Sequence, residues 1–153
     1  MINKKDLQIL SYLRKNARMN LTKMSRLTGI PVSTIFDKLK LFQKEVVRKH
    51  TTLVDFENLG YSTRANIILK SKKDKKAELR DYLMRCEHVN SMYRISNGYD
   101  YMIECIFRNI KEMEEFTEML EDRFDVEDKK SFYLIDDLRK ESFLADNLEL
   151  LRL

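Results

Sequence analysis

The chain has 153 residues, of which 43% are hydrophobic and 35% are charged, and its formal net charge is +4. That length suits one ordinary domain or two small ones, and the composition excludes a disordered chain. The N-terminal residues lack the apolar stretch of a secretory signal, and no run approaches the roughly 20 apolar residues that cross a bilayer. We therefore expect a cytoplasmic protein with no membrane partner.

The positive charge is concentrated in the first part of the chain. Residues 1–60 contain 12 Lys and Arg against 5 Asp and Glu, a net charge of +7, whereas residues 61–153 contain 17 against 20, a net charge of −3. A basic field of this kind attracts the phosphate backbone of nucleic acids and releases its counterions. The asymmetry favours a nucleic-acid partner for the N-terminal part.

Three short helices are predicted within residues 4–42. Apolar residues recur at helical spacing in each, and Gly29 and Pro31 mark a sharp turn between the second and the third. The expected inward positions are Leu7, Leu10, Leu13 and Ala17 in the first helix, Leu21, Met24 and Leu27 in the second, and Val32, Ile35, Phe36, Leu39 and Phe42 in the third. A plain helical bundle would show the same stripes.

The polar side of the third predicted helix is the candidate site. Two helices joined by a tight turn, the second with a small polar and basic outer face, form a helix-turn-helix that reads the DNA major groove. Base-facing candidates are Ser33, Thr34, Asp37 and Lys38, and phosphate-contact candidates are Lys23, Arg26, Lys40, Lys44, Arg48 and Lys49. Asp37 would repel phosphates, so we expect it to select a base, for example by accepting from a cytosine amine.

The second half of the chain alternates strands and helices in the order βαββαβ. Strands are predicted near residues 61–70, 89–95, 101–107 and 130–135, with helices striped by Leu79, Tyr82 and Leu83 and by Met113, Phe116, Leu120 and Phe124. Asn97 and Gly98 form a strong hairpin dipeptide, because a type I′ turn needs positive φ at both central positions. The fold class is therefore α+β, with a ferredoxin-like open four-stranded antiparallel sheet and two helices.

An open sheet with helices on one side leaves its other side bare. Ile68, Met102 and Ile106 lie on that second side, which favours a sheet-to-sheet dimer over a half-exposed sheet with scattered apolar residues. Between the two halves, residues 46–61 predict a short β-wing followed by a linker strand. We thus expect a winged helix-turn-helix domain at 1–50, a linker strand at 51–60, and a ferredoxin-like dimerisation domain at 61–153.

No catalytic, metal or cofactor site is visible. Cys86 and Cys105 are 19 residues apart and predict buried free thiols, and His50 and His88 have no ligand partner at suitable spacing. The acidic stretch at residues 112–128 predicts a solvated helix face, although it could also repel DNA or dock a basic partner. Phe143, Leu144, Leu148 and Leu151 fall on a helical stripe in the C-terminal tail.

The order of these elements, the segment VVRKHTTLVDFENLGY at 46–61 and the SNGYDY hairpin together resemble the Lrp/AsnC (feast/famine) family of transcription regulators. The resemblance covers residues 4–135. It implies a recognition helix from Val32 to about Phe42, dimers that assemble into tetramers or octamers, and an amino-acid effector near Gly98, Tyr99 and Asp100. The absence of Gly before Val46, Pro31 in the turn and His50 in place of an aromatic residue depart from the family pattern.

The resemblance implies a sequence-specific regulator of double-stranded DNA rather than an enzyme. One alternative is an architectural DNA-binding protein with little sequence preference. Another is a tetrapyrrole-processing enzyme on the same scaffold, which the single histidine of the second domain disfavours because that chemistry needs paired acid–base groups.

Overall fold

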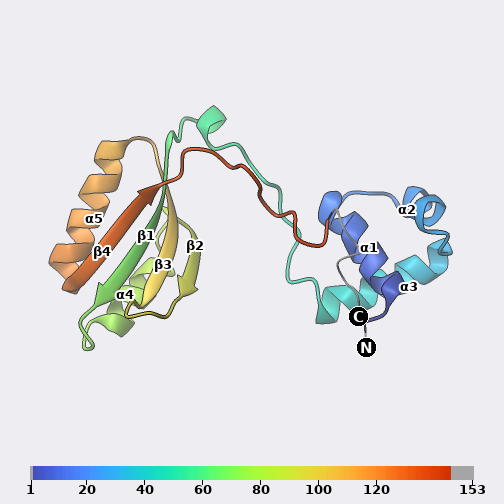
Figure 1. Cartoon of the computed structure of the whole chain (residues 1–153), viewed down its shortest axis with the longest axis horizontal. Coiled ribbons are helices and arrows are strands. Elements are labelled where there is room, and N and C mark those ends of the chain that lie inside the picture. The colour runs from blue at the N-terminus through green and yellow to red at the C-terminus, as the bar shows by residue number, and fades with distance from the viewer. Residues whose placement is uncertain (1, 146–153) are drawn as a thin grey trace. The chain divides into compact units, whose positions relative to one another are not determined.

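The structure, a computed structural model, describes residues 2–145 of the chain, which forms two compact units (Figure 1). The first unit combines Met1–Leu53 with Leu138–Leu153, and the second is Val54–Asp137. The chain therefore leaves the first unit, builds the second, and returns to the first. Leu148 and Leu151 of the predicted tail stripe lie outside the described residues.

The first unit is a three-helix domain made of α1 (Lys4–Lys15), α2 (Leu21–Thr28) and α3 (Val32–Glu45). Asn3 and Asn20 cap the first two helices by accepting hydrogen bonds from the backbone N–H groups of Asp6 and Lys23. The buried core contains Ile9, Leu10, Met24, Ile30, Ile35 and Phe42. The predicted helix-turn-helix is confirmed.

The turn between α2 and α3 follows the chemistry of its residues. Gly29 ends α2 with φ at +69°, a conformation that costs glycine nothing and strains other residues. Pro31 occupies the N-cap position of α3, one residue before the helical turn in which we expected it. The turn thereby directs α3 away from α2 over only three residues.

Residues 47–55 contain no strand, so the predicted β-wing and linker strand do not form there. The N–H groups of Val46 and Val47 both donate to the carbonyl of Phe42, at 2.8 and 2.7 Å. These amides complete the C-terminal end of α3 and are not available for a strand ladder. A short 3₁₀ turn at Glu57–Leu59 follows before the second unit begins its sheet.

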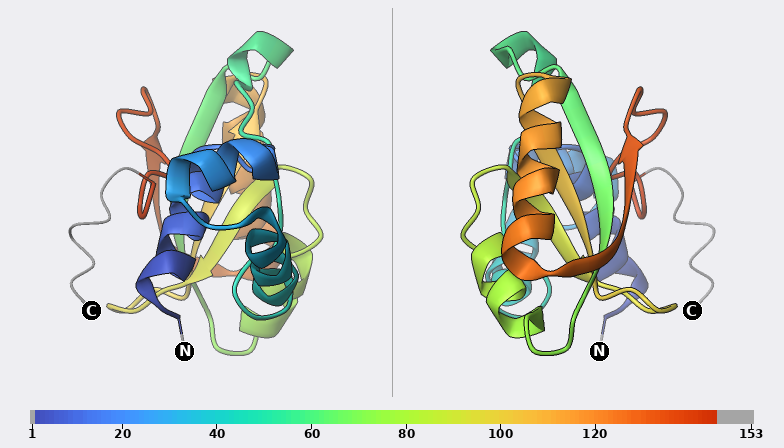
Figure 2. Two further views of the ribbon diagram at one scale, coloured as in Figure 1. Left: turned by 90° about the vertical axis from the view of Figure 1, so that its right-hand side faces the viewer. Right: turned by 90° about the vertical axis from the view of Figure 1, so that its left-hand side faces the viewer.

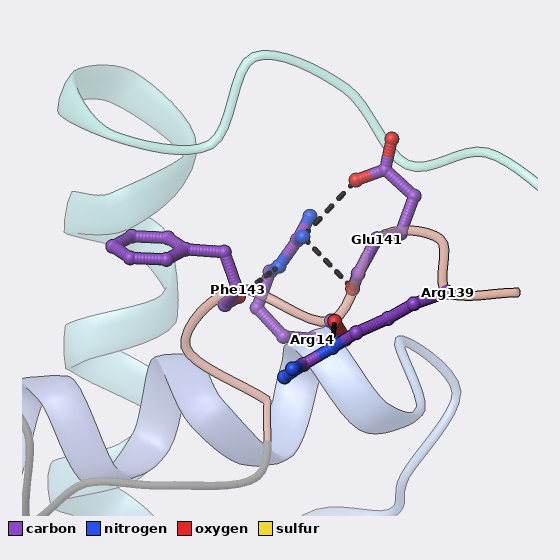
Figure 3. A network of polar contacts seen from close by, with 5 residues as sticks. Arg14, Arg139, Glu141 and Phe143 are labelled. Carbon is purple, nitrogen blue, oxygen red and sulfur yellow. Dashed lines mark hydrogen bonds and ion pairs between the residues drawn. The ribbon is translucent and has the colours of Figure 1, made fainter.

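The described tail residues 138–145 pack on α1 of the first unit, whereas the sequence analysis grouped them with the second domain (Figure 3). Arg14 holds the tail: its Nε donates to the carbonyl of Phe143 at 3.1 Å, and its Nη2 donates to the carbonyl and carboxylate of Glu141 at 2.9 and 3.0 Å. The hydroxyl of Ser11 donates to the carbonyl of Ala145 at 3.1 Å in the buried interior. Residues 138–145 therefore belong to the helical unit.

The second unit confirms the predicted βαββαβ order. Its elements are β1 (Thr63–Ser71), α4 (Lys76–Leu83), β2 (Val89–Arg94), β3 (Tyr101–Phe107), α5 (Ile110–Phe124) and β4 (Val126–Tyr133). The strands form one antiparallel sheet in the order β2-β3-β1-β4. Helices α4 and α5 cover one face of it (Figure 2). β4 begins four residues before its predicted start at residue 130, directly after α5.

Alternation along the strands separates a core face from an open face. Ile67, Leu69, Ile103 and Phe107 are completely buried under the helices. On the opposite face, Tyr93, Met102 and Ile68 lie side by side in register across β2, β3 and β1. The further open-face apolar residues are Ile106 and, in β4, Phe132, which is half-exposed.

Candidate DNA interface and hairpin site

The outward side of α3 carries the predicted polar residues. Ser33, Thr34 and Asp37 are exposed, and Ile35 and Phe42 on the other side of the same helix are buried in the core. The helical period puts Ser33 and Asp37 one turn apart on one stripe. These three polar side chains are therefore accessible to a partner that docks along α3.

A set of exposed cations surrounds this surface. Within the described part of the chain, no acidic partner pairs with the exposed Lys and Arg residues of α2, α3 and the segment after α3. They are Lys23, Arg26, Lys40, Lys44, Arg48 and Lys49. Cations without an acidic partner keep their full charge for an external polyanion. The surface is suited to phosphate.

Lys38 is engaged inside the unit. Its Nζ lies 2.9 Å from Oδ1 of Asp6, whose other oxygen accepts from the backbone N–H of Asn3 at 3.0 Å. Burial raises the pKa of Asp6, but the Asn3 hydrogen bond and the Lys38 charge outweigh burial, and the net pKa is lowered. The ion pair joins α1 to α3, and this use of Lys38 competes with the base-facing position predicted for it.

Val32 and Phe36 differ from the expected inward placement. Val32 is 41% exposed and Phe36 is 48% exposed, although both were predicted on the core stripe of the third helix. The ammonium of Lys40 lies 4.3 Å from the centre of the Phe36 ring, a cation–π distance. Each of these residues is four positions from the next, so they form one apolar-to-basic stripe along α3.

The second candidate site is the hairpin between β2 and β3. Asn97 has φ at +67° and Gly98 at +85°, which confirms the positive φ predicted for both turn positions. No other atom lies within 4 Å of the place where a side chain on Gly98 would begin. The backbone of Gly98 is therefore open to a ligand.

Asp100 and Tyr99 already have partners within the unit. Asp100 accepts hydrogen bonds from the backbone N–H and the hydroxyl of Ser71, at 3.0 and 3.3 Å, and pairs with Lys76. Burial raises the pKa of Asp100, but the Lys76 ammonium and the Ser71 N–H outweigh burial and lower it overall. Tyr99 donates to Asp128 at 2.7 Å. The carboxylate of Asp100 thus anchors the hairpin to the start of α4.

The acidic stretch at residues 112–128 makes its polar contacts within the second unit. Acidic residues of the 112–128 stretch pair with Arg108 N–H, Tyr133, Lys129, Lys72 and Lys70.

Cys86 and Cys105 are free thiols, the first half-buried and the second buried. Residues 2–145 hold no group of three or more His, Cys, Asp or Glu placed to bind a metal ion. Across the same residues, none of the helices combines the length and apolarity required to traverse a membrane.

Comparisons with known proteins match both units. The family described as Lrp/AsnC ligand binding domain matches residues 62–142, and the family described as winged helix-turn-helix DNA-binding matches residues 2–45. The HTH-type transcriptional regulator FL11 of Pyrococcus abyssi is 33% identical over 75% of this chain and 77% of its own. FL11 of Pyrococcus furiosus is 30% identical over the same shares.

Solved structures share the fold at low sequence identity. A transcriptional regulator of Neisseria meningitidis, solved as a complex with L-Met, has a TM-score of 0.84 at 19% identity and covers 92% of this chain and 94% of its own. LrpC of B. subtilis has a TM-score of 0.82 at 15% identity and covers 91% and 98%.

Proposed function

The chain belongs to the Lrp/AsnC family of DNA-binding transcriptional regulators, and from that premise we propose that α3 is the helix with which it reads the DNA major groove. The observation that carries this proposal is the outward face of α3, where Ser33, Thr34 and Asp37 are exposed between unpaired cations. An α-helix fits into the major groove, and short polar side chains on it can form hydrogen bonds with base edges.

The surrounding cations supply affinity rather than selectivity. We propose that phosphates beside the groove are neutralised by Lys23 and Arg26 of α2, Lys40 and Lys44 of α3, and Arg48 and Lys49 after it, all of which are exposed. Each neutralised phosphate releases condensed counterions, so the affinity should fall steeply as salt rises. Sequence selection then rests on the base-facing residues of α3.

Selection of binding sites from random duplex DNA by the purified full chain tests this function. A defined consensus with half-sites about one helical turn, ~34 Å, or a multiple apart is expected of a symmetric regulator. Tight binding without a consensus would favour the architectural alternative. No binding at moderate salt would refute the assignment of α3.

We propose that the open face of the sheet is where two copies of the chain associate. Tyr93, Met102 and Ile68 form a continuous apolar row on that face, which is not covered by α4 or α5. Tyr93→Lys or Phe132→Lys should lower the mass measured by light scattering to that of one chain. Met84→Lys is the control, since Met84 is 65% exposed in the same unit but lies outside the sheet. An unchanged mass in all three variants would refute this interface.

We propose that a small effector, with an amino acid as the first candidate, binds against the Gly98 turn. The support is the open backbone at Gly98, together with the L-Met bound by the neisserial regulator of the same fold. Asp100 would hold the turn in place through Ser71 and Lys76 instead of receiving the ammonium group itself. Titrating the twenty amino acids against DNA affinity and thermal stability tests this role.

A further inference from the structure

The stripe of Val32, Phe36 and Lys40 on α3 has no task within the helical unit. The core is filled from the other side of α3 by Ile35, which is completely buried, and by Phe42 at 1% exposure. Val32 and Phe36 instead leave more than two fifths of their surface in water. Exposed apolar groups on an otherwise polar helix face mark a contact surface when they lie together.

The place of this stripe along the helix limits what it can contact. Val32 is the first residue of α3 and Phe36 lies one turn later, within the N-terminal half that enters a major groove in helix-turn-helix proteins. The polar stripe of Ser33 and Asp37 runs beside it. A major groove that contacts Ser33 and Asp37 therefore also contacts the neighbouring stripe of Val32 and Phe36 at its edge.

The chemistry of the major groove offers one apolar group, the C5-methyl of thymine. Resting on the function proposed above, we propose that Val32 and Phe36 read thymine methyl groups, so that part of the sequence preference comes from apolar contact. Lys40 lies over the Phe36 ring and keeps its charge at the outer end of the stripe, where a phosphate is the complementary group. The operator accordingly contains thymines at fixed positions that Asp37 and Ser33 do not select.

Replacing each thymine of the selected site by deoxyuridine tests this proposal, because the exchange removes only the methyl group. The parent protein should lose about fourfold in affinity for each buried methyl that is removed. Phe36→Ala should bind the thymine site more weakly than the parent protein does. At one thymine position, replacement by deoxyuridine should cause no further loss of affinity in Phe36→Ala. At another position, the replacement should cause no further loss of affinity in Val32→Ala. Leu41→Ala is the matched control, because Leu41 is 39% exposed in the later part of α3 and its variant should keep the full deoxyuridine effect.

Circular dichroism and thermal unfolding of each variant verify that α3 stays folded. Three results would overturn the proposal: no deoxyuridine effect in the parent protein, equal effects in the parent and Phe36→Ala, or a changed assembly mass of Phe36→Ala, which would assign the ring to a protein contact. Failure of the proposed function looks different, since the parent protein would then bind no DNA, or would bind DNA without selecting any site.

Discussion

The ammonium of Lys38 lies 2.9 Å from the carboxylate of Asp6, and this ion pair fastens α3 to α1. The same carboxylate closes the capping box at the start of α1 through the N–H of Asn3. One buried acid therefore fixes both the N-terminus of one helix and the position of the helix that we assign to the groove.

Asp6→Asn should lower the stability of the helical unit by roughly 1–3 kcal/mol, since it leaves Lys38 without its counter-charge. The pKa of Asp6 is lowered in the folded chain, so its contribution is complete above the ordinary pKa of about 4 and is lost as the pH falls through the folded value. Hydrogen exchange of α1 and α3 amides at pH 7 and at acidic pH measures this effect. Asp37→Asn, at an exposed acid that precedes Lys38 on α3, is the control and should leave exchange unchanged.

Substitution of Lys38 should change the stability of the helical unit, whereas substitution of Lys40 should change its DNA affinity. Lys40→Ala should reduce the slope of log affinity against log salt by about 1, because one phosphate contact is lost. Lys38→Ala should instead destabilise the unit and leave that slope unchanged. Fluorescence anisotropy at several salt concentrations provides the slopes. A reduced slope for Lys38→Ala would show that Lys38 leaves Asp6 to contact DNA.

Local signals in the sequence predict much of this molecule. The helical and strand periods, Gly29, and the Asn97-Gly98 pair identify the helix-turn-helix and the βαββαβ order, because each depends on neighbours within a few residues. The Asn3 and Asp6 spacing is itself a capping-box signal that the sequence reading missed. The Asp6–Lys38 pair joins residues 32 positions apart, and no periodicity reports such a contact.

Two further differences have the same long-range origin. The tail contacts of Arg14 cross 127 and 129 residues of sequence, so no pattern in α1 indicates them. Phe36 lies on an apolar stripe that looks internal, but the core of a three-helix unit is narrow and is filled by Ile35, Leu39 and Phe42. The apolar pattern of a helix shows which residues can be buried, and the neighbouring helices determine which are.

Arg14→Ala should release the tail from α1. Two of the three hydrogen bonds that Arg14 donates go to backbone carbonyls. Arg14→Ala should therefore weaken the attachment of the tail more than Glu141→Ala, which removes only an exposed ion pair worth about 0–1 kcal/mol. We expect faster hydrogen exchange and faster proteolysis at residues 138–145, in the order Arg14→Ala, Glu141→Ala, parent. Arg18→Ala, a neighbouring exposed cation, should match the parent. Equal protection in all four proteins would contradict the role of Arg14.

The two thiols should react at different rates. Burial raises the pKa of the Cys105 thiol well above its usual range, and its side chain is completely buried beneath the helices. Cys86 is half-buried after α4. Alkylation of the folded chain at pH 8, read by peptide mass spectrometry, should modify Cys86 first and Cys105 only on unfolding. Cys86→Ser should abolish the early modification.

The hairpin offers a test that separates its fold from its ligand. Gly98→Ala meets no neighbouring atom, so its cost is the backbone strain of φ at +85°, about 1–2 kcal/mol. Asp100→Asn removes the charge that pairs with Lys76 and should lower the free energy of unfolding of the second unit. Because the folded pKa of Asp100 is lowered, its contribution to stability is lost at acidic pH. The variant should therefore lack this pH-dependent part of the stability. If the effector packs on the Gly98 backbone, Gly98→Ala should weaken effector binding more than a variant of equal stability loss elsewhere, such as Leu79→Ala or a milder Leu79→Val in the core. Equal binding in the Gly98 and Leu79 variants would exclude the turn as the effector site and leave Asn97 and Gly98 as a hairpin alone.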